Sequence, residues 1–228
     1  MTARVLGVIP AKAHSRRAPG KNMREIAGRP LIDYTIEAAK TAASLTAACL
    51  TSEDESILAH AERAGITPVA RDPDMSGDAV HASVPILAAL EKLGGSDAYD
   101  FCVMLLPTFP LRTAATIDAV VARSIEIGKT VLSVSALNKT IYHLRTLTED
   151  GRIRHVTDEK RTNFQSQDAP LLHSINGCCY CAPTGPLLRE RSFHHGDPTA
   201  FVTDHIEAWD IDTEDDLRFA ELLLKARR

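Results

Sequence analysis

Four cations lie within ten residues near the start of the chain. Lys12, Arg16, Arg17 and Lys21 follow the apolar run Val5–Ile9 with no acid among them, although the whole chain has a formal net charge of -4. Like charges at this spacing repel one another unless an anion neutralises them. The segment therefore favours an anion-binding loop, and a solvated basic turn is the alternative.

Two carboxylates separated by one residue lie near the other end of the chain. In an extended segment at the end of a sheet, Asp210 and Asp212 face the same way. Such a pair is costly unless a cation lies between the carboxylates, and Mg²⁺ prefers oxygen ligands of this kind. The alternative is that Asp212 or Thr213 caps the last helix, with acids at 214–216 in its first turn. Capping leaves Asp210 unexplained, so we expect Mg²⁺ at Asp210 and Asp212.

A basic loop after the first strand and an Asp-x-Asp near the end of the sheet together suggest a nucleoside triphosphate bound with Mg²⁺. The loop does not match Gly-x-x-x-x-Gly-Lys-Ser/Thr, and the chain contains no Gly-x-Gly-x-x-Gly. The two commonest phosphate-binding motifs are therefore excluded. Ser15 and Ser52 have no nearby His and Asp pattern that would support a hydrolase triad.

The elements that must position these residues alternate along the chain. Short apolar runs predict buried strands, and segments with helical periodicity separate them. We expect strands at 5–9, 47–52, 67–70, 101–106, 130–136 and 178–182, and helices at about 30–43, 57–64, 79–93, 113–127 and 213–225. This order predicts an α/β fold with a doubly wound, mostly parallel sheet, which binds ligands beyond the carboxyl ends of its strands.

The segment 138–175 departs from this alternation. It is polar, its periodicity is weak, and residues 149–152 have the composition of a hairpin turn. A structureless loop of this length is uncommon in a compact domain. We therefore predict one domain over 1–228, with 138–175 inserted as a small β-rich arm. Its apolar residues would leave an exposed patch, which indicates a partner subunit and hence a homodimer.

Composition excludes several classes of protein. The chain has 228 residues, no apolar run near the roughly 20 needed to span a bilayer, and no secretory leader before Pro10. Its negative net charge and 5% aromatic content argue against a nucleic-acid partner. The five cysteines mostly lie in apolar runs, which predicts reduced thiols in a cytoplasmic protein, and we expect no zinc site at Cys178-Cys179-Tyr180-Cys181.

The motifs, taken in order, resemble those of the acylneuraminate cytidylyltransferases, the CMP-sialic acid synthetases and their relatives for other nonulosonic acids. The likeness spans nearly the whole chain, and the first motif combined with the last is specific. The matching segments are Ile9-Pro10-Ala11-Lys12, Ser15-Arg16, Pro19-Gly20-Lys21-Asn22, residues 106–112, Asn176-Gly177 with Tyr180, and Asp210-Ile211-Asp212-Thr213-Glu214.

The resemblance implies a Rossmann-like nucleotidyltransferase that moves CMP from CTP to the hydroxyl of an acidic sugar, releasing pyrophosphate, with Mg²⁺ as cofactor. It assigns catalytic roles to Lys12, Arg16, Lys21 and Asp212, and Mg²⁺ binding to Asp210 and Asp212. It assigns nucleotide binding to Ala11, Lys12, Ser15, Arg16, Lys21, Asn22, Arg71, Val80 and Ala82. It assigns the acceptor site to Leu106, Thr108, Arg145, Arg161, Gln167, Asn176 and Tyr180. The family's enzymes are dimers in which the arm helps to close the neighbour's sugar pocket.

This chain departs from the family pattern mainly on the acceptor side. Leu106 stands where the family has glutamine, and Ser166 and Ser174 stand where it has arginines suited to a sugar carboxylate. Arg145 and Arg161 could substitute for them. The alternatives are a nucleotidyltransferase of the same fold with another base or a non-sugar acceptor such as a phosphonate, and a non-catalytic nucleotide-binding regulatory protein.

Overall fold

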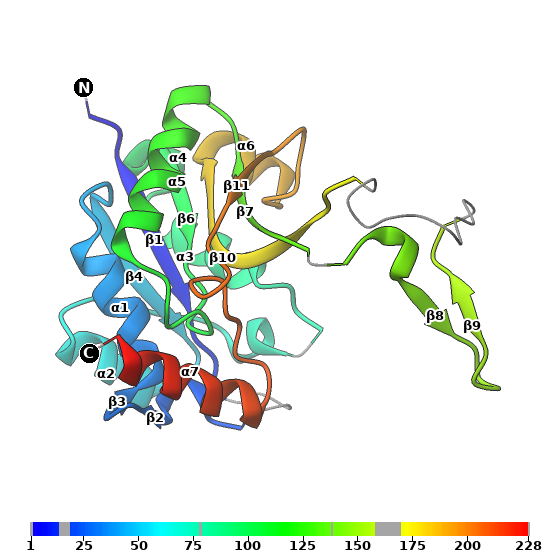
Figure 1. Ribbon diagram of the computed structural model, residues 1–228. Coiled ribbons are helices and arrows are strands. Elements are labelled where there is room, and N and C mark those ends of the chain that lie inside the picture. Colours follow the sequence, from blue (N-terminus) through cyan, green and yellow to red (C-terminus); the bar gives the residue numbers. More distant parts are fainter. Residues whose placement is uncertain (1, 14–18, 78, 138, 158–169, 228) are drawn as a thin grey trace.

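A seven-stranded sheet runs through the protein (Figure 1), in the order β11-β7-β10-β6-β1-β4-β5. This computed structural model describes residues 2–13, 19–77, 79–137, 139–157 and 170–227. Strand β10 is antiparallel to both of its neighbours, and every other pair in the sheet is parallel. The predicted mostly parallel α/β sheet is confirmed. Its strands are β1 (Val5–Pro10), β4 (Ala47–Ser52), β5 (Thr67–Ala70), β6 (Phe101–Met104), β7 (Val131–Ala136), β10 (His173–Pro183) and β11 (Thr199–Val202).

Helices cover both faces of the sheet, because each strand of the parallel core is apolar on both sides. Along β1, Val5 and Ile9 join one buried cluster, whereas Leu6 and Val8 join the other. The first cluster lies under α1 (Leu31–Thr41), α2 (Glu55–Arg63) and α5 (Ala114–Ile127). The second lies under α3 (Ser83–Lys92) and α6 (Thr184–Glu190), and the short helix α4 (Gly95–Ala98) follows α3. The fold is therefore doubly wound, as predicted.

The last helix, α7 (Glu214–Ala226), packs against the start of the chain. Its Leu217 and Ala220 form a third buried cluster with Leu31 of α1 and with Ile211, which is fully buried. Ile26 of the small hairpin formed by β2 (Glu25–Ile26) and β3 (Arg29–Pro30) joins them. The cluster fixes Ile211, and with it the backbone of the two aspartates on either side.

Some strand boundaries differ from the sequence prediction, and one strand was not predicted. The sheet resumes at His173 rather than Cys178, because β10 pairs with β7 from His173 onward and shifts register between Ile175 and Tyr180. A bulge of this kind breaks the alternation that identifies a strand. Strand β6 ends at Met104, two residues early, and the four-residue edge strand β11 was not predicted. The antiparallel β10 could not be read from its apolar run.

The arm contains the predicted hairpin. After a short 3-10 turn at Ile141–His143, β8 (Arg145–Leu147) pairs antiparallel with β9 (Ile153–His155) around the predicted turn. The hairpin lies away from the sheet, at the right of Figure 1. Its Leu147 and Ile153 are 75% and 66% exposed in the single chain. Of the residues predicted to form an exposed apolar patch, Leu144 and Leu147 are exposed whereas Tyr142 is 7% exposed, so the prediction is confirmed only in part.

Two predictions from composition can be compared with the fold. Among the described residues, no helix has both the length and the apolar content needed to cross a bilayer. All five cysteines are free and buried. Burial raises the pKa of the Cys49 and Cys181 thiols to about 12, so both are neutral and unreactive at pH 7.

Candidate active site

A cavity of about 480 Å³ opens beyond the carboxyl ends of β1, β5 and β6. The motifs that the sequence analysis singled out meet there, although they lie up to two hundred residues apart in the chain. The lining residues are Pro10, Lys12, Lys21, Asn22, Arg71, Met75, Ser76, Gly77, Val80, Ala82, Pro85, Leu106, Pro107, Thr108, Asp210 and Asp212. The cavity has the place in the sheet at which open α/β folds bind ligands.

The loop after β1 forms one wall of this cavity. The backbone N–H of Ala11 donates to Thr51 of β4, so the loop starts as a continuation of the sheet. Further along, Asn22 is 5% exposed, and its Nδ2 donates to the carbonyl oxygen of Lys12 at 2.8 Å. This bond ties the two ends of the loop together and places Lys12 and Lys21 on the same cavity. The predicted residues Ser15 and Arg16 lie outside the described residues.

Lys21 connects the basic loop to the Asp-x-Asp segment. Its Nζ donates to the carbonyl oxygen of Ile211 at 2.6 Å and lies 3.8 Å from Oδ1 of Asp212. The Lys21 side chain is only 12% exposed. A cation in a basic loop is expected to be exposed, and the burial of Lys21 corrects that expectation. The apolar stem is covered where α7 and the loop after β1 meet, and the ammonium group reaches the acidic side of the cavity.

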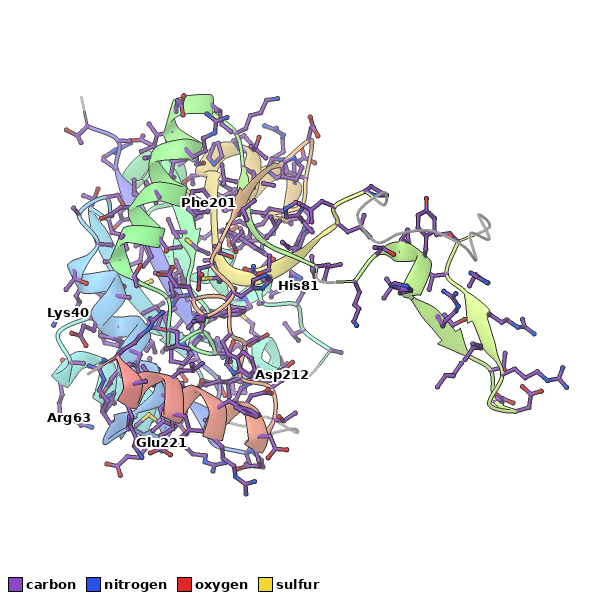
Figure 2. All side chains as sticks on the ribbon, viewed as in Figure 1. Lys40, Arg63, His81, Phe201, Asp212 and Glu221 are labelled. Carbon is purple, nitrogen blue, oxygen red and sulfur yellow. The ribbon has the colours of Figure 1, made fainter. Side chains whose placement is uncertain are left out.

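The Asp-x-Asp segment is not part of the sheet. It forms an extended loop, held by the bond from the backbone N–H of Ile211 to the carbonyl oxygen of Thr108, and leads into α7. The helix is capped by Thr213, which forms a reciprocal capping box with Asp216. The alternative that Asp212 or Thr213 caps the helix is therefore confirmed for Thr213 and wrong for Asp212. Figure 2 labels Asp212 at the amino end of α7.

The acidic side of the cavity suits a divalent cation. Burial, together with the charge of Asp212, raises the pKa of the Asp210 carboxyl above its usual value, against the opposing effects of Thr108 and Lys21. A cation between the two carboxylates would relieve this cost. No cluster of three or more metal-ligating side chains occurs among the described residues. The carboxylates of Asp210 and Asp212 fit Mg²⁺, because Mg²⁺ commonly binds one or two carboxylates and completes its coordination shell with phosphates and water.

Arg71 borders the cavity but directs its donors into the protein. The guanidinium is buried and donates to the carbonyl oxygens of Thr51 (2.6 Å) and Ala11 (3.0 Å). It also donates to Ser76 Oγ (2.9 Å) and Glu53 Oε2 (2.7 Å). Sequence reasoning assigned Arg71 to the base and ribose and missed Glu53, because nothing in the sequence shows that the two are in contact.

The residues predicted for the acceptor divide into three groups. Leu106 and Thr108 line the cavity. Tyr180 is not among the lining residues and packs against Phe193 and His194. Burial and the charge of Asp210 raise the pKa of its hydroxyl to about 12. Arg145 lies on the arm, and Arg161 and Gln167 lie outside the described residues. Val80 and Ala82 line the cavity, as the nucleotide-side prediction required.

Asn176 organises the bulge in β10 instead of facing the cavity. Its Oδ1 accepts from Ser133 Oγ (2.7 Å) and from the backbone N–H of Cys178 (3.1 Å). Its Nδ2 donates to Ser135 Oγ (2.7 Å) and Thr203 Oγ1 (3.0 Å). The amide is therefore engaged by the protein on both sides. In this structure Asn176 shapes the wall of the site and does not offer its side chain to a ligand.

Arg112 holds the loop that follows β6 in place through its hydrogen bonds. The residue is 3% exposed and donates to the carbonyl oxygens of Cys178 and Leu106 and to Thr35 Oγ1. Burial lowers its pKa. These bonds join β10, α1 and the end of β6, and they set the position of Leu106 at the cavity edge.

Gly177 is required by the packing behind Leu106. A Cβ added there would lie 2.6 Å from Leu106 Cδ1 and 3.0 Å from Cε2 of the buried Phe109. We expect Gly177→Ala to lower the free energy of unfolding by about 1–3 kcal/mol, the usual cost of overpacking. Urea denaturation would measure it. Gly185→Ala is the matched control, since a Cβ there meets nothing within 4 Å in α6; equal losses in both variants would contradict the packing argument.

Comparison with known proteins identifies the family. A family model described as cytidylyltransferase matches residues 6–226. This chain belongs to the cytidylyltransferase family. The match covers both the loop after β1 and the Asp-x-Asp segment.

Curated relatives of this cytidylyltransferase match it from end to end. A CMP-N,N'-diacetyllegionaminic acid synthase of Legionella pneumophila is 29% identical over 227 residues, covering 97% of both chains. A pseudaminic acid cytidylyltransferase of Campylobacter jejuni is 29% identical over 223 residues, covering 96% of both. An N-acylneuraminate cytidylyltransferase of Streptococcus agalactiae matches 92% of this chain and 50% of its own length, at 29% identity.

Solved structures support the fold. A CMP:2-keto-3-deoxy-manno-octonic acid synthetase complexed with CTP has a TM-score of 0.75 at 13% identity, and covers 99% of this chain and 100% of that one. A 4-diphosphocytidyl-2C-methyl-D-erythritol synthase from Anaerococcus prevotii has a TM-score of 0.69 at 12% identity, covering 98% and 96%. Both likenesses show that the cytidylyltransferase has the same α/β fold.

Proposed function

We propose that this protein transfers CMP from CTP to a hydroxyl of an acidic, nonulosonic acid-like sugar and releases pyrophosphate. The observation that carries the proposal is the single cavity in which Lys12, Lys21 and Asn22 meet Asp210 and Asp212. The names of the full-length relatives, which concern legionaminic and pseudaminic acid, support an acidic sugar as acceptor. The buried thiols are consistent with the cytoplasmic location expected from the sequence.

The reaction requires the protein to position the two substrates and to stabilise negative charge. The acceptor oxygen bonds to the α-phosphorus as the bond from that phosphorus to the bridging oxygen breaks, and pyrophosphate leaves with the electron pair while the hydroxyl loses its proton. Negative charge grows on the phosphoryl and leaving oxygens. Lys12 and Lys21 line the cavity and can stabilise that charge. Pro85, Leu106 and Pro107 supply the apolar wall beside them.

Asp210 and Asp212 would hold Mg²⁺, which when bound neutralises charge on the triphosphate oxygens and helps to orient them. The raised pKa of Asp210, with the charges of Asp212 and Asp216 nearby, supports a cation site beside these carboxylates. Without a divalent cation, the same carboxylates would repel a triphosphate. We therefore expect turnover to require Mg²⁺ and to cease when EDTA removes it.

We expect CTP with Mg²⁺ to raise the melting temperature more than ATP, GTP or UTP does. Ligand at one hundred times its dissociation constant adds about 2.7 kcal/mol of stability, which thermal denaturation detects easily. A pyrophosphate-release assay with the four nucleotides and a panel of acidic sugars and phosphonates tests the reaction. Equal shifts from all four nucleotides would contradict a cytidine-specific site, and binding of CTP without turnover of any acceptor would favour a regulatory protein.

We further propose a homodimer in which the arm of one subunit reaches the acceptor side of the other. Arg145 begins β8, which lies away from the sheet in Figure 1, and it donates to the carbonyl oxygens of Tyr142 and Leu144 on the arm. The exposed Leu147 and Ile153 beside it suit a subunit interface. Arg145 can therefore serve an acceptor only across such an interface.

In this arrangement Arg145→Ala should raise the Michaelis constant for the acceptor about tenfold and leave that for CTP unchanged, because one charge-assisted contact is lost. Steady-state kinetics would show this. Arg152→Ala, at the tip of the same hairpin with a side chain that is 83% exposed, is the control. A monomer in light scattering at the assay concentration would contradict the dimer, and an unchanged acceptor constant would remove Arg145 from the site.

A further inference from the structure

Glu53 lies in the segment that joins β4 to α2, next to residues that line the cavity. Its Oε1 accepts from the backbone N–H of Ala13 at 2.9 Å. Its Oε2 accepts from Arg71 at 2.7 Å and from the hydroxyl of Ser76 at 2.5 Å. The two side chains of the ion pair are 13% and 4% exposed, for Glu53 and Arg71 respectively. One carboxylate thus receives three donors from two separate segments of the chain, the loop after β1 and residues 71–76.

These segments form two different walls of the cavity. Ala13 follows Lys12 in the loop after β1, which faces the phosphate side in the proposed function. Ser76 belongs to the 3-10 turn Pro73–Ser76, which lines another part of the same cavity with Met75 and Gly77. Glu53 itself is not among the lining residues. Any effect it has on a ligand must therefore pass through the residues that it holds.

Arg71 completes the same connection. It donates to Ala11 in the loop after β1 and to Ser76 in the turn, so both walls are tied to one buried ion pair. Burial alone would raise the pKa of the Glu53 carboxyl, but the bonds from Ser76 and Ala13 and the charge of Arg71 outweigh it and lower that pKa. The carboxylate is therefore ionised at neutral pH and accepts from all three groups at once.

We propose that Glu53 is a positioning residue that, through Arg71 and Ser76, couples the phosphate wall of the cavity to the wall formed by residues 72–77. The proposal rests on the proposed function for the identity of the ligand, CTP. A nucleotide that spans both walls needs them at a fixed separation, and preorganisation of this kind lowers the cost of binding. Glu53 and Arg71 set that separation, and neither has to touch the nucleotide.

The test is Glu53→Gln in the full-length protein. Glutamine keeps the length of the side chain, but its single oxygen cannot serve both sides, and its NH₂ group must face either the Ala13 N–H or the Arg71 and Ser76 donors. We expect the Michaelis constant for CTP to rise about tenfold or more, with the acceptor constant changing less than twofold. Hydrogen exchange followed by mass spectrometry should show faster exchange in both 11–13 and 72–77.

Two further variants make the result specific. Ser76→Ala leaves the Glu53 bonds to Ala13 and Arg71 in place, so exchange should rise in 72–77 alone. Glu55→Gln removes an exposed carboxylate two residues away in the first turn of α2, and should change neither segment nor the CTP constant.

The outcomes separate this proposal from the proposed function. Faster exchange in only one wall or in neither, or faster exchange in both with an unchanged CTP constant, would overturn the positioning role. Faster exchange throughout the sheet in Glu53→Gln would indicate global destabilisation, and Ser76→Ala would then decide, because its predicted effect is confined to one wall. If the unmodified protein turns over no CTP, the proposed function fails, and the coupling of the walls stands or falls on the exchange result.

Discussion

Asp212→Asn is expected to lower kcat for cytidylyl transfer about a hundredfold while changing the free energy of unfolding by less than about 1 kcal/mol. Asparagine keeps the size of the side chain but removes one of the two charges proposed to hold Mg²⁺, and loss of an electrostatic contact to the reacting phosphates typically has an effect of this size. The fold should survive, because Thr213 and Asp216 cap α7 without the Asp212 side chain. Steady-state kinetics over a range of Mg²⁺ concentrations, together with urea denaturation, measure both effects.

Asp215→Asn is the matched control for this prediction. Asp215 lies three residues further along in the first turn of α7, has a side chain that is 75% exposed, and pairs with Arg218 rather than facing the cavity. It should keep full activity. Raising the Mg²⁺ concentration should restore part of the rate in Asp212→Asn if its metal affinity is what has fallen. Full Mg²⁺-dependent activity in Asp212→Asn at ordinary concentrations would show that Asp212 is not a ligand.

The meeting of the basic loop and the two aspartates could be predicted from the sequence. Val5–Ile9 reads as a buried strand, and the cations follow its carboxyl end, where an open α/β sheet binds ligands. The structure confirms that Lys12 and Lys21 share a cavity with Asp210 and Asp212. The sequence could not show whether Asp212 or Thr213 caps the last helix, because both residues precede the acids of its first turn. The bonds of Thr213 and Asp216 decide it.

Long-range polar contacts were beyond the sequence. Asn176 looked available for an acceptor, yet Ser133, Ser135 and Thr203 saturate its amide from strands and loops that no local pattern places beside it. Arg71 is similar: a charged residue after a strand suggests a ligand contact, but Glu53 and two carbonyl oxygens take its donors. Periodicity reports which face of an element is buried, and it carries no information on which buried polar groups pair.

A contact of this kind changes the result expected for a Lys21 variant. Treated as an exposed cation, its removal would leave stability untouched. In the structure its side chain is 12% exposed and its Nζ donates to the carbonyl oxygen of Ile211 at 2.6 Å. Loss of a buried hydrogen bond from a charged group costs about 1.5–3 kcal/mol. We therefore expect Lys21→Met, which keeps the apolar stem, to lower both stability and turnover.

The two losses can be separated by their size. We expect kcat to fall a hundredfold or more, since Lys21 is the cation placed between the loop after β1 and the Asp-x-Asp segment, where charge develops during transfer. A loss of about 2 kcal/mol in stability leaves a protein of ordinary stability, about 5–15 kcal/mol, almost wholly folded at the assay temperature, so unfolding cannot account for such a fall.

Lys40→Met is the control, because the Nζ of Lys40 also donates to a backbone carbonyl, that of Ala64 at 2.7 Å, and Lys40 is not among the residues that line the cavity. Figure 2 labels Lys40. The Lys40→Met variant should lose stability to a smaller degree and keep its rate. A rate for Lys21→Met that falls only in proportion to its folded fraction would make Lys21 a structural residue. A hundredfold fall in a folded protein would place its charge at the transferred phosphate.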